Sequence, residues 1–459
     1  MSGFFRCLAC SLFLLAPSAM AADTGGEHWI GTWAAAAQHW LPGRLASFRN
    51  QTVRLIVHTS AGGAKARIKI ANTYGDQPLQ IATVHIARRT AGADIDPASD
   101  RTVTFHGHKA LTVAPRSIAV SDPVDLDVPA RSDLAVSLFF RETALATTSH
   151  SLAQQTNYVS PETGDSTGDA KFTSAKTILS WPFLTGVDVA APPRAFAIVA
   201  FGSSLTDGDG STKDTNKRWP DVLAERLQNC ADKDAPVGVL NEGIIGDRLV
   251  SDSSSPRQKG GPFGAVFEDL GPAIGESGLA RFDRDVLQQS GVKFVVLALG
   301  INDILFPGAF VPASESMSAQ TLIAANRQLL ARAHKNGVKA IITTLPSCEG
   351  AFFRGPLITF CTPENEKVRQ EVNTWVRNTK EFDGMIDFDQ PVADPSHPAR
   401  ILPEYDSGDH LHPNDAGYVA TANAVPLTLF GCSERKQASR RRVAVFTESE
   451  PARATNDPE

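Results

Sequence analysis

The stretch Ala195-Phe196-Ala197-Ile198-Val199-Ala200-Phe201-Gly202-Ser203-Ser204-Leu205-Thr206-Asp207-Gly208 decides the fold of the second half of the chain. Its first seven residues are all apolar, and the run stops at a glycine and two serines. A continuous apolar run bounded by turn residues predicts a strand buried on both faces, as in a parallel sheet. Residues 220–227 then have proline in the first turn and helical apolar spacing, which predicts a helix. The serines therefore lie at the carboxyl end of a central strand, where open α/β sheets bind ligands.

The same alternation of strand and helix continues along the chain. Residues 237–241 and 293–299 are apolar enough to form buried strands. Residues 321–336 have the pattern of a helix that ends at Gly337 and leads into a strand over 338–345. This order predicts a doubly wound α/β domain.

The region from Trp29 to about Val189 has a different texture. Residues 52–58, 66–70 and 134–140 alternate apolar with polar side chains, and glycine, aspartate and proline interrupt the runs at short intervals. Regular short strands without an intervening helix predict a β-sandwich or jelly roll. Ala191-Pro192-Pro193 reads as the linker to the α/β domain.

The amino terminus predicts export. Arg6 precedes the apolar run 7–16, and Ala19-Met20-Ala21 is a small-x-small cleavage site. A transmembrane anchor would need about 20 apolar residues, so we expect a signal peptide cut after Ala21 and a periplasmic or secreted protein. Lipid attachment at Cys10 is a less favoured alternative, because the apolar run continues past it.

Length, composition and charge bound the rest. The chain has 459 residues, of which 42% are hydrophobic and 20% charged, enough for two domains with buried cores. A net charge of -6 gives no reason to expect nucleic acid or an anionic membrane as a partner. We divide the chain into a signal peptide (1–21), a β-sandwich domain (22–190), an α/β domain (194–432) and a polar, disordered tail (433–459).

The cysteines predict disulfides rather than a metal site. Two of the six cysteines leave with the signal peptide, and an even number in an exported chain favours disulfides. Cys348 and Cys361 flank one short loop and are the favoured pair, which leaves Cys230 with Cys432. The mature chain has no C-x-x-C or H-x-x-x-H spacing, so we expect no zinc.

Two serines stand among glycines. Gly164-Asp165-Ser166-Thr167-Gly168 matches the nucleophile-elbow pattern G-x-S-x-G, but polar loop residues flank it where a strand and a helix are required. A surface loop is the favoured interpretation. Ser204 has the strand and the helix, although Thr206 stands where the pattern requires its second glycine.

Four blocks resemble those of the GDSL, or SGNH, esterase family, in the family's order. They are Phe201-Gly202-Ser203-Ser204-Leu205-Thr206-Asp207-Gly208, Asn241-Glu242-Gly243-Ile244-Ile245-Gly246-Asp247, Gly300-Ile301-Asn302-Asp303 and Asp409-His410-Leu411-His412-Pro413-Asn414. The resemblance covers residues 194–432 and implies a three-layer α/β/α domain of flavodoxin-like type. The β domain and Gly31-Thr32-Trp33 are similar, more loosely, to secreted two-domain members that act on carbohydrate esters.

The resemblance implies a catalytic triad. A serine hydroxyl needs a base to accept its proton, and the base must be oriented by a third group. The family pattern makes Ser204 the nucleophile and His412 the base, with Asp409 three residues earlier to orient the imidazole. His410 competes with His412 on spacing alone, and the family pattern favours His412.

The resemblance also implies three oxyanion donors: the backbone N–H groups of Ser204 and Gly246 and the side-chain amide of Asn302. Negative charge develops on the carbonyl oxygen during acyl transfer, and such donors stabilise it. Gly246 has a structural alternative as an ordinary turn glycine, and Asn302 has one as a helix cap.

Ser203 departs from the family, in which aspartate is usual at this position. That aspartate is not the triad acid, so the departure concerns how the turn beneath Ser204 is braced rather than the chemistry itself.

We expect a secreted serine ester hydrolase that uses no cofactor and removes small acyl groups, acetyl above all, from carbohydrate or other small esters. One alternative is a lipase or general short-chain esterase. Another is a carbohydrate-binding protein with a decayed catalytic domain. The β domain contains four tryptophans that could stack on sugar rings, although core packing is the favoured role. They are Trp29, Trp33, Trp40 and Trp181.

Overall fold

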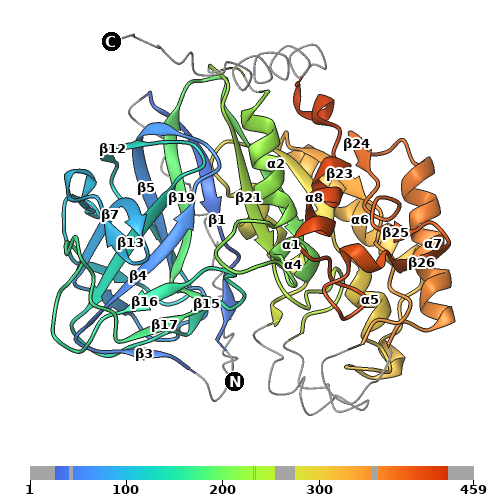
Figure 1. Ribbon diagram of the computed structural model, residues 1–459, viewed down its shortest axis with the longest axis horizontal. Coiled ribbons are helices and arrows are strands. Elements are labelled where there is room, and N and C mark those ends of the chain that lie inside the picture. The colour runs from blue at the N-terminus through green and yellow to red at the C-terminus, as the bar shows by residue number, and fades with distance from the viewer. Residues whose placement is uncertain are drawn as a thin grey trace, which may run out of the picture.

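The structure is a computed structural model that describes residues 26–40, 45–230, 232, 234–253, 274–352 and 360–432. Strands dominate up to residue 191, and strands alternate with helices from residue 196 onwards (Figure 1). The predicted signal peptide (1–21) and tail (433–459) lie outside the described residues.

The amino-terminal region contains two larger antiparallel sheets. The first has the order β1-β19-β5-β11, with β12 also paired to β5. Its strands are β1 (His28–Ala34), β5 (Gly63–Ala71), β11 (Ile118–Val120), β12 (Val124–Val128) and β19 (Leu184–Ala191). The second has the order β17-β16-β4-β13-β7-β8, with β9 also paired to β7. Its strands are β4 (Gln51–His58), β7 (Thr83–Ala91), β8 (Asp94–Ile95), β9 (Arg101–Thr102), β13 (Asp133–Phe140), β16 (Asn157–Val159) and β17 (Lys176–Ile178).

Shorter strands complete this region. They are β2 (Gln38–His39), β3 (Ser47–Phe48), β6 (Leu79–Ile81), β10 (Leu111–Val113), β14 (Ala144–Leu145), β15 (Thr148–His150) and β18 (Trp181–Pro182). One buried apolar cluster contains side chains of both larger sheets, for example Ile68 of β5 and Val136 of β13. The strands predicted over 52–58, 66–70 and 134–140 are confirmed as β4, β5 and β13.

Strand β4 buries a charge that its alternating pattern would place in solvent. Arg54 is fully buried, and its guanidinium donates to the backbone carbonyls of Ala93, Ser166, Thr167 and Asp169. A buried charge is tolerated when its donors are satisfied. The loop around Ser166 is therefore held as a structural cover, with no helix following the serine, as its polar flanks predicted.

The carboxyl-terminal region is built on a parallel sheet with the order β21-β20-β22-β23-β24. Its strands are β20 (Phe196–Gly202), β21 (Val237–Gly243), β22 (Val292–Ala298), β23 (Lys339–Thr343) and β24 (Gly384–Ile386). The helices are α1 (Ser204–Asp207), α2 (Trp219–Gln228), α4 (Gly278–Phe282), α5 (Ile301–Leu305), α6 (Ala319–Lys335), α7 (Pro363–Asn378) and α8 (Asp415–Asn423), and a hairpin pairs β25 (Ala393–Asp394) with β26 (His397–Ile401).

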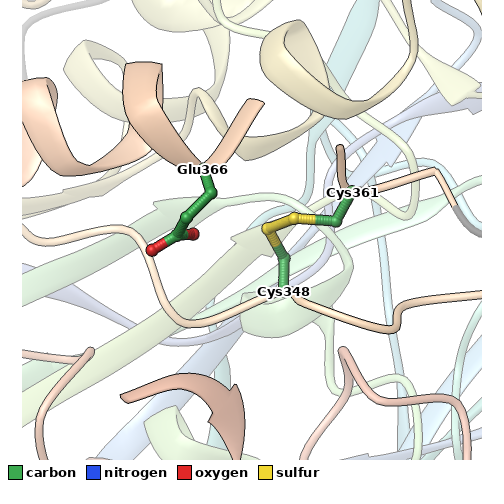
Figure 2. Close-up of side chains that lie close together, drawn as sticks. All are labelled: Cys348, Cys361 and Glu366. Atoms are coloured by element: carbon green, nitrogen blue, oxygen red, sulfur yellow. A yellow bond between two sulfur atoms is a disulfide. The ribbon is translucent and has the colours of Figure 1, made fainter. Parts of the chain in front are cut away.

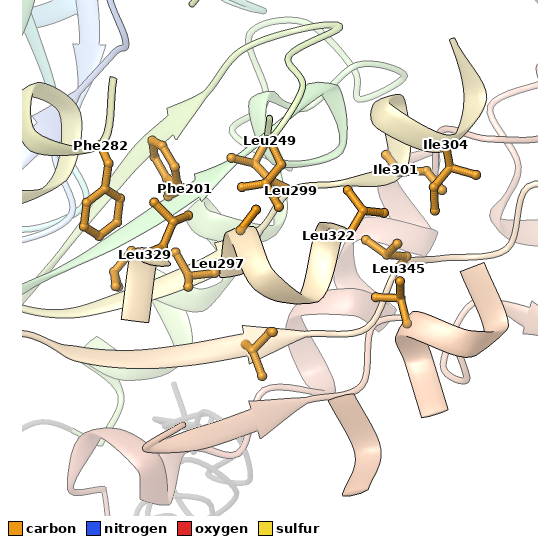
Figure 3. Close-up of a cluster of buried hydrophobic side chains, with 14 of the residues drawn as sticks. Phe201, Leu249, Phe282, Leu297, Leu299, Ile301, Ile304, Leu322, Leu329 and Leu345 are labelled. Atoms are coloured by element: carbon orange, nitrogen blue, oxygen red, sulfur yellow. The ribbon is translucent and has the colours of Figure 1, made fainter. Parts of the chain in front are cut away.

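Central strand β20 is buried on both faces, as its unbroken apolar run predicts. Ala197, Val199 and Phe201 belong to one apolar cluster, which includes side chains of α4, α5, α6 and α7. Figure 3 shows Phe201 in this cluster with side chains of α4, α5 and α6. Ile198 and Ala200 belong to another, which includes side chains of α2 and α8. Helices therefore cover the sheet on both sides. The predicted helix at 321–336 is confirmed as α6, and the strands predicted at 237–241, 293–299 and 338–345 are confirmed as β21, β22 and β23.

Two disulfides join the cysteines in the expected pairs, Cys348 with Cys361 and Cys230 with Cys432. The second links the chain just after α2 to Cys432, which follows a short 3-10 helix (Leu427–Phe430), across 202 positions. Within the described residues, every helix is too short or too polar to cross a bilayer.

Candidate active site

Ser204 lies at the first residue of α1, directly after the carboxyl end of β20. The turn between them is tight: a Cβ on Gly202 would lie 2.0 Å from Oγ1 of Thr206, so only glycine fits there. The carbonyl of Ser203 accepts the N–H groups of Thr206 and Asp207, both at 2.9 Å. The apolar strand and the tight turn thus hold Ser204 at the edge of the sheet.

His412 and Asp409 reach Ser204 from the loop that precedes α8. The Nε2 atom of His412 lies 2.8 Å from Oγ of Ser204, and its Nδ1 lies 2.6 Å from Oδ2 of Asp409. Both distances are hydrogen-bonding distances. The imidazole therefore lies between a hydroxyl and a carboxylate, in the order that activation of a serine requires.

The Asp409 carboxylate is held as an anion. Its Oδ1 accepts the backbone N–H groups of Leu411 at 3.0 Å and His412 at 2.8 Å. Burial acts to raise the pKa of Asp409, but the hydrogen bonds from the His412 ring and from these two N–H groups lower it to about 2. The carboxylate can thus orient the Nδ1–H tautomer of His412 and stabilise the imidazolium form.

The competing histidine, His410, is oriented elsewhere. Its Nδ1 lies 2.5 Å from Oδ2 of Asp406, and its ring packs edge-on against Phe352. About half of the His410 side chain is exposed. The structure therefore brings His412, and not its neighbour, to the serine.

The three expected oxyanion donors follow three adjacent parallel strands. Ser204, Gly246 and Asn302 come shortly after the carboxyl ends of β20, β21 and β22. Because these strands are neighbours in the order β21-β20-β22, the three residues lie at one edge of the sheet.

Gly246 occupies a position that only glycine can fill without strain. Its φ is +74°, and a Cβ there would lie 2.3 Å from Cγ2 of Ile274. It belongs to a turn in which the Ile244 carbonyl accepts the N–H of Asp247 at 3.1 Å. Gly246 can be both a turn glycine and an oxyanion donor, because the turn sets the direction of the backbone N–H groups in this loop.

Asn302 is 3% exposed and lies in the first turn of α5. Its side-chain amide donates to the carbonyl of Asp247 at 2.9 Å, rather than capping the helix. An amide has two N–H bonds, so this contact fixes the group and leaves the other N–H to donate. Asp303 supports the same loop by accepting the N–H groups of Leu249 and Val250. Burial raises the pKa of Asp303 to about 6.

Ser203, the departure from the family pattern, is fully buried. Its hydroxyl has no hydrogen-bond partner among the described residues. Other groups brace the turn: Arg281 donates to the Gly202 carbonyl at 3.0 Å, and the Trp219 indole donates to the Thr206 hydroxyl at 3.3 Å.

Asp209 is a site residue that the sequence did not single out. Its Oδ2 lies 3.8 Å from Nε2 of His412, and its side chain is about one-third exposed. A second carboxylate, partly exposed to solvent, thus lies near the imidazole. Asp209 directly follows the block that contains Ser204, but no sequence pattern predicts that its side chain lies near His412.

Three of the four tryptophans serve the core, which was their favoured role. Trp29, Trp33 and Trp181 are at most 6% exposed. Trp33 and Trp181 pack edge to face with ring centroids 5.0 Å apart, and the Trp181 indole donates to the Ile56 carbonyl. Trp40 is partly buried against the same core.

One cluster has the composition of a metal site: Cys348, Cys361 and Glu366 (Figure 2). Both sulfurs belong to the disulfide, so neither is a thiolate that could bind a metal ion. The Glu366 carboxylate accepts two hydrogen bonds from the Arg369 guanidinium. These contacts give the cluster a structural role.

A hydroxyl, an imidazole and a carboxylate in this order are the arrangement that serine hydrolases use, and here they lie at the edge of an α/β sheet. Residues 198–425 match the family described as GDSL-like Lipase/Acylhydrolase. The carboxyl-terminal region of the chain therefore belongs to this family of ester hydrolases.

Solved structures with a similar region include the acetylxylan esterase Axe2 from Geobacillus stearothermophilus. It is 18% identical, with a TM-score of 0.34, over 53% of this chain and 96% of that one. The aryl esterase of M. smegmatis is 17% identical, with a TM-score of 0.36, over 52% of this chain and 100% of that one. A search of curated proteins found no match.

Proposed function

We propose that Ser204, His412 and Asp409 form the catalytic triad of an ester hydrolase that works through an acyl-serine intermediate. The observation that carries the proposal is the pair of distances around His412, 2.8 Å to Ser204 Oγ and 2.6 Å to Asp409 Oδ2. A base within hydrogen-bond reach of the nucleophile, itself oriented by a carboxylate, is the arrangement that makes a serine nucleophilic.

The reaction has two halves. Ser204 Oγ attacks the ester carbonyl while its proton passes to His412 Nε2, and the carbonyl oxygen becomes an oxyanion that the N–H groups of Ser204, Gly246 and Asn302 stabilise. The imidazolium then gives that proton to the departing alkoxide, which leaves as an alcohol. In the second half, a water molecule gives a proton to His412 and attacks the acyl-serine. Collapse releases the carboxylic acid and returns the proton to Ser204.

One contact on the leaving-group side of His412 supports a proposal for the leaving alcohol. The Asp209 carboxylate lies near the nitrogen that protonates the departing alkoxide. A carboxylate accepts hydrogen bonds from hydroxyl groups and repels anions. We therefore propose neutral, hydroxyl-rich leaving alcohols. The resemblance to family members that act on carbohydrate esters is the basis for proposing small acyl groups such as acetyl, on carbohydrate or other small esters.

We further propose that the protein is exported and has two domains. Residues 22–190 would form a β-sandwich of jelly-roll type, and residues 194–432 a three-layer domain whose strand order corresponds to the flavodoxin-like 2-1-3-4-5. Two disulfides support a periplasmic or extracellular location, because such bonds persist in oxidising compartments.

A panel of p-nitrophenyl esters of increasing acyl length, assayed beside acetylated xylan with acetate release followed, tests this function. We expect turnover to be fastest with acetyl, and Ser204→Ala to abolish it. A preference for long acyl chains would instead favour a lipase. A fluorophosphonate probe should label Ser204; failure to label it, together with binding of xylan, would favour a carbohydrate-binding protein with a decayed catalytic domain.

A further inference from the structure

A buried pair of side chains joins the strand-rich region to the segment that carries the nucleophile. Nε2 of His150, the last residue of β15, lies 2.9 Å from Oδ1 of Asp207. Asp207 ends α1, three residues after Ser204. Both side chains are less than 5% exposed, so water does not weaken their interaction.

Both ring nitrogens of His150 are hydrogen-bonded. Its Nδ1 lies 3.0 Å from the carbonyl oxygen of Ala36, which can only accept, so Nδ1 carries a proton. The Nε2 contact with Asp207 therefore completes the hydrogen bonding of a buried imidazole. Ring packing against Trp181, with centroids 5.7 Å apart, holds the imidazole in place.

The other oxygen of Asp207 holds the loop that carries Gly246. Oδ2 accepts the backbone N–H of Ile245 at 3.0 Å, one residue before that glycine. The end of β21 packs so close to α1 that a Cβ on Gly243 would lie 2.3 Å from the Asp207 nitrogen. One carboxylate therefore connects β15, the nucleophile segment and the oxyanion loop.

Residues just after His150 extend the same contact. The side-chain amide of Gln154 donates to the Gly208 carbonyl at 3.4 Å. The backbone carbonyl of Gln154 accepts the N–H of Asp214 at 2.9 Å. The Asp214 carboxylate accepts from the Gln155 amide at 2.8 Å and from the Thr156 hydroxyl at 2.7 Å. The segment 150–156 thus runs along residues 207–214, which lead away from Ser204.

We propose that His150 is a positioning residue for ester hydrolysis, and that the amino-terminal strands are therefore part of the catalytic unit. By fixing Asp207, His150 sets the distance between Ser204 and the Gly246 N–H that receives the developing oxyanion. This inference rests on the proposed function. It predicts that the loss of His150 weakens binding of the transition state more than binding of the ester, because the donors matter most when the charge has formed.

Two amide substitutions at this position test the proposal. His150→Gln places its amide nitrogen near the position of Nε2 and can still donate to Asp207. His150→Asn is one methylene shorter, and its amide lies near Nδ1, within reach of Ala36 only. Both variants are polar and smaller than histidine, so they form a matched pair. Arg131→Gln, which removes an exposed contact with Glu225 between the same two regions, is the control.

The readouts are kcat and KM on p-nitrophenyl acetate with the full chain, together with thermal unfolding. We expect kcat of His150→Asn to fall about 10- to 100-fold below that of His150→Gln, with KM within about threefold, since removing one oxyanion donor outright costs about 100- to 1,000-fold. Arg131→Gln should keep the wild-type kcat.

Equal kcat values for the two His150 variants would overturn the inference, as would a change confined to KM. Ser204→Ala in the same assay separates this outcome from failure of the proposed function. If that variant is inactive while the His150 variants match each other, only the positioning role is wrong. If Ser204→Ala retains turnover, the proposed active site itself is wrong.

Discussion

Nε2 of His412 lies 2.8 Å from Oγ of Ser204, although 208 positions separate the two residues in the chain. His410, only two residues from His412, is hydrogen-bonded to Asp406 instead. Each histidine contacts an aspartate in the same loop, but only His412 also contacts Ser204. Substituting them in turn therefore separates the loss of the contact with the serine from the loss of a contact within the loop.

Substitution of each histidine by alanine should separate the two roles. We expect His412→Ala to lower kcat by at least about a thousandfold, because the serine loses its base. His410→Ala should keep most of the turnover, since its contacts with Asp406 and Phe352 are partly exposed. Steady-state kinetics on p-nitrophenyl acetate measure both, and a complete loss in His410→Ala would contradict the assignment of the base.

Asn302→Ala should lower kcat by roughly two to three powers of ten, because one oxyanion donor is worth about 3 kcal/mol of barrier. KM should change little. The amide also holds the Asp247 carbonyl, so the unfolding free energy of the variant must be measured beside its kinetics. An unchanged kcat with reduced stability would show that Asn302 only holds the loop.

The Asp409 carboxylate should make stability depend on pH in a defined window. Its pKa falls from 3.8 to about 2 on folding, so the unfolded chain binds the proton more readily. The stabilisation is therefore fully present above about pH 4 and is lost as the pH falls towards 2, an effect of about 2 kcal/mol. Asp409→Asn lacks this group.

Urea unfolding of wild type and Asp409→Asn between pH 2 and pH 6 measures the effect. The difference between their unfolding free energies should narrow by about 2 kcal/mol as the pH falls through this window. A constant difference would mean that the hydrogen bonds to His412 and Leu411 do not favour the anion.

The sequence predicts those helices and strands that are determined by the pattern of apolar residues within the element itself. Strand β20 and helix α6 were found from the spacing of apolar residues over a few turns or pleats. The blocks around Ser204, Gly246 and Asn302 each follow a strand directly, so parallel topology alone brings them to one edge.

Other features depend on contacts between distant segments. The pairing of His150 with Asp207 arises where the two regions pack together, and neither neighbourhood carries a sign of it. The burial of Arg54 is likewise not predictable from its neighbours in the sequence, because it depends on the loop that covers β4. Helix α7 was missed for a different reason: Thr362 and Pro363 are helix-start signals, but the helix is largely polar.

The two disulfides should contribute unequally to stability. Their sequence separations are 202 and 13 positions. In the chain-entropy account, the unfolded state loses more freedom from the longer loop, which gives roughly 5 kcal/mol against roughly 3 kcal/mol. Cys230→Ser with Cys432→Ser should therefore lower the unfolding free energy by about 2 kcal/mol more than Cys348→Ser with Cys361→Ser. Urea unfolding under oxidising conditions measures this, and a larger loss from the shorter loop would contradict it.

Gly246→Ala should impair both stability and turnover, for two separable reasons. A positive φ costs a residue with a Cβ about 1 to 2 kcal/mol, and the new methyl group would also meet Ile274. Adding Ile274→Ala relieves the contact and leaves the strain. We therefore expect the double variant to recover part of the lost kcat, measured relative to Ile274→Ala alone, while the cost of the backbone conformation remains. If Gly246→Ala keeps the wild-type kcat, its N–H does not need the position that the turn gives it, and the oxyanion would have to rely on Ser204 and Asn302.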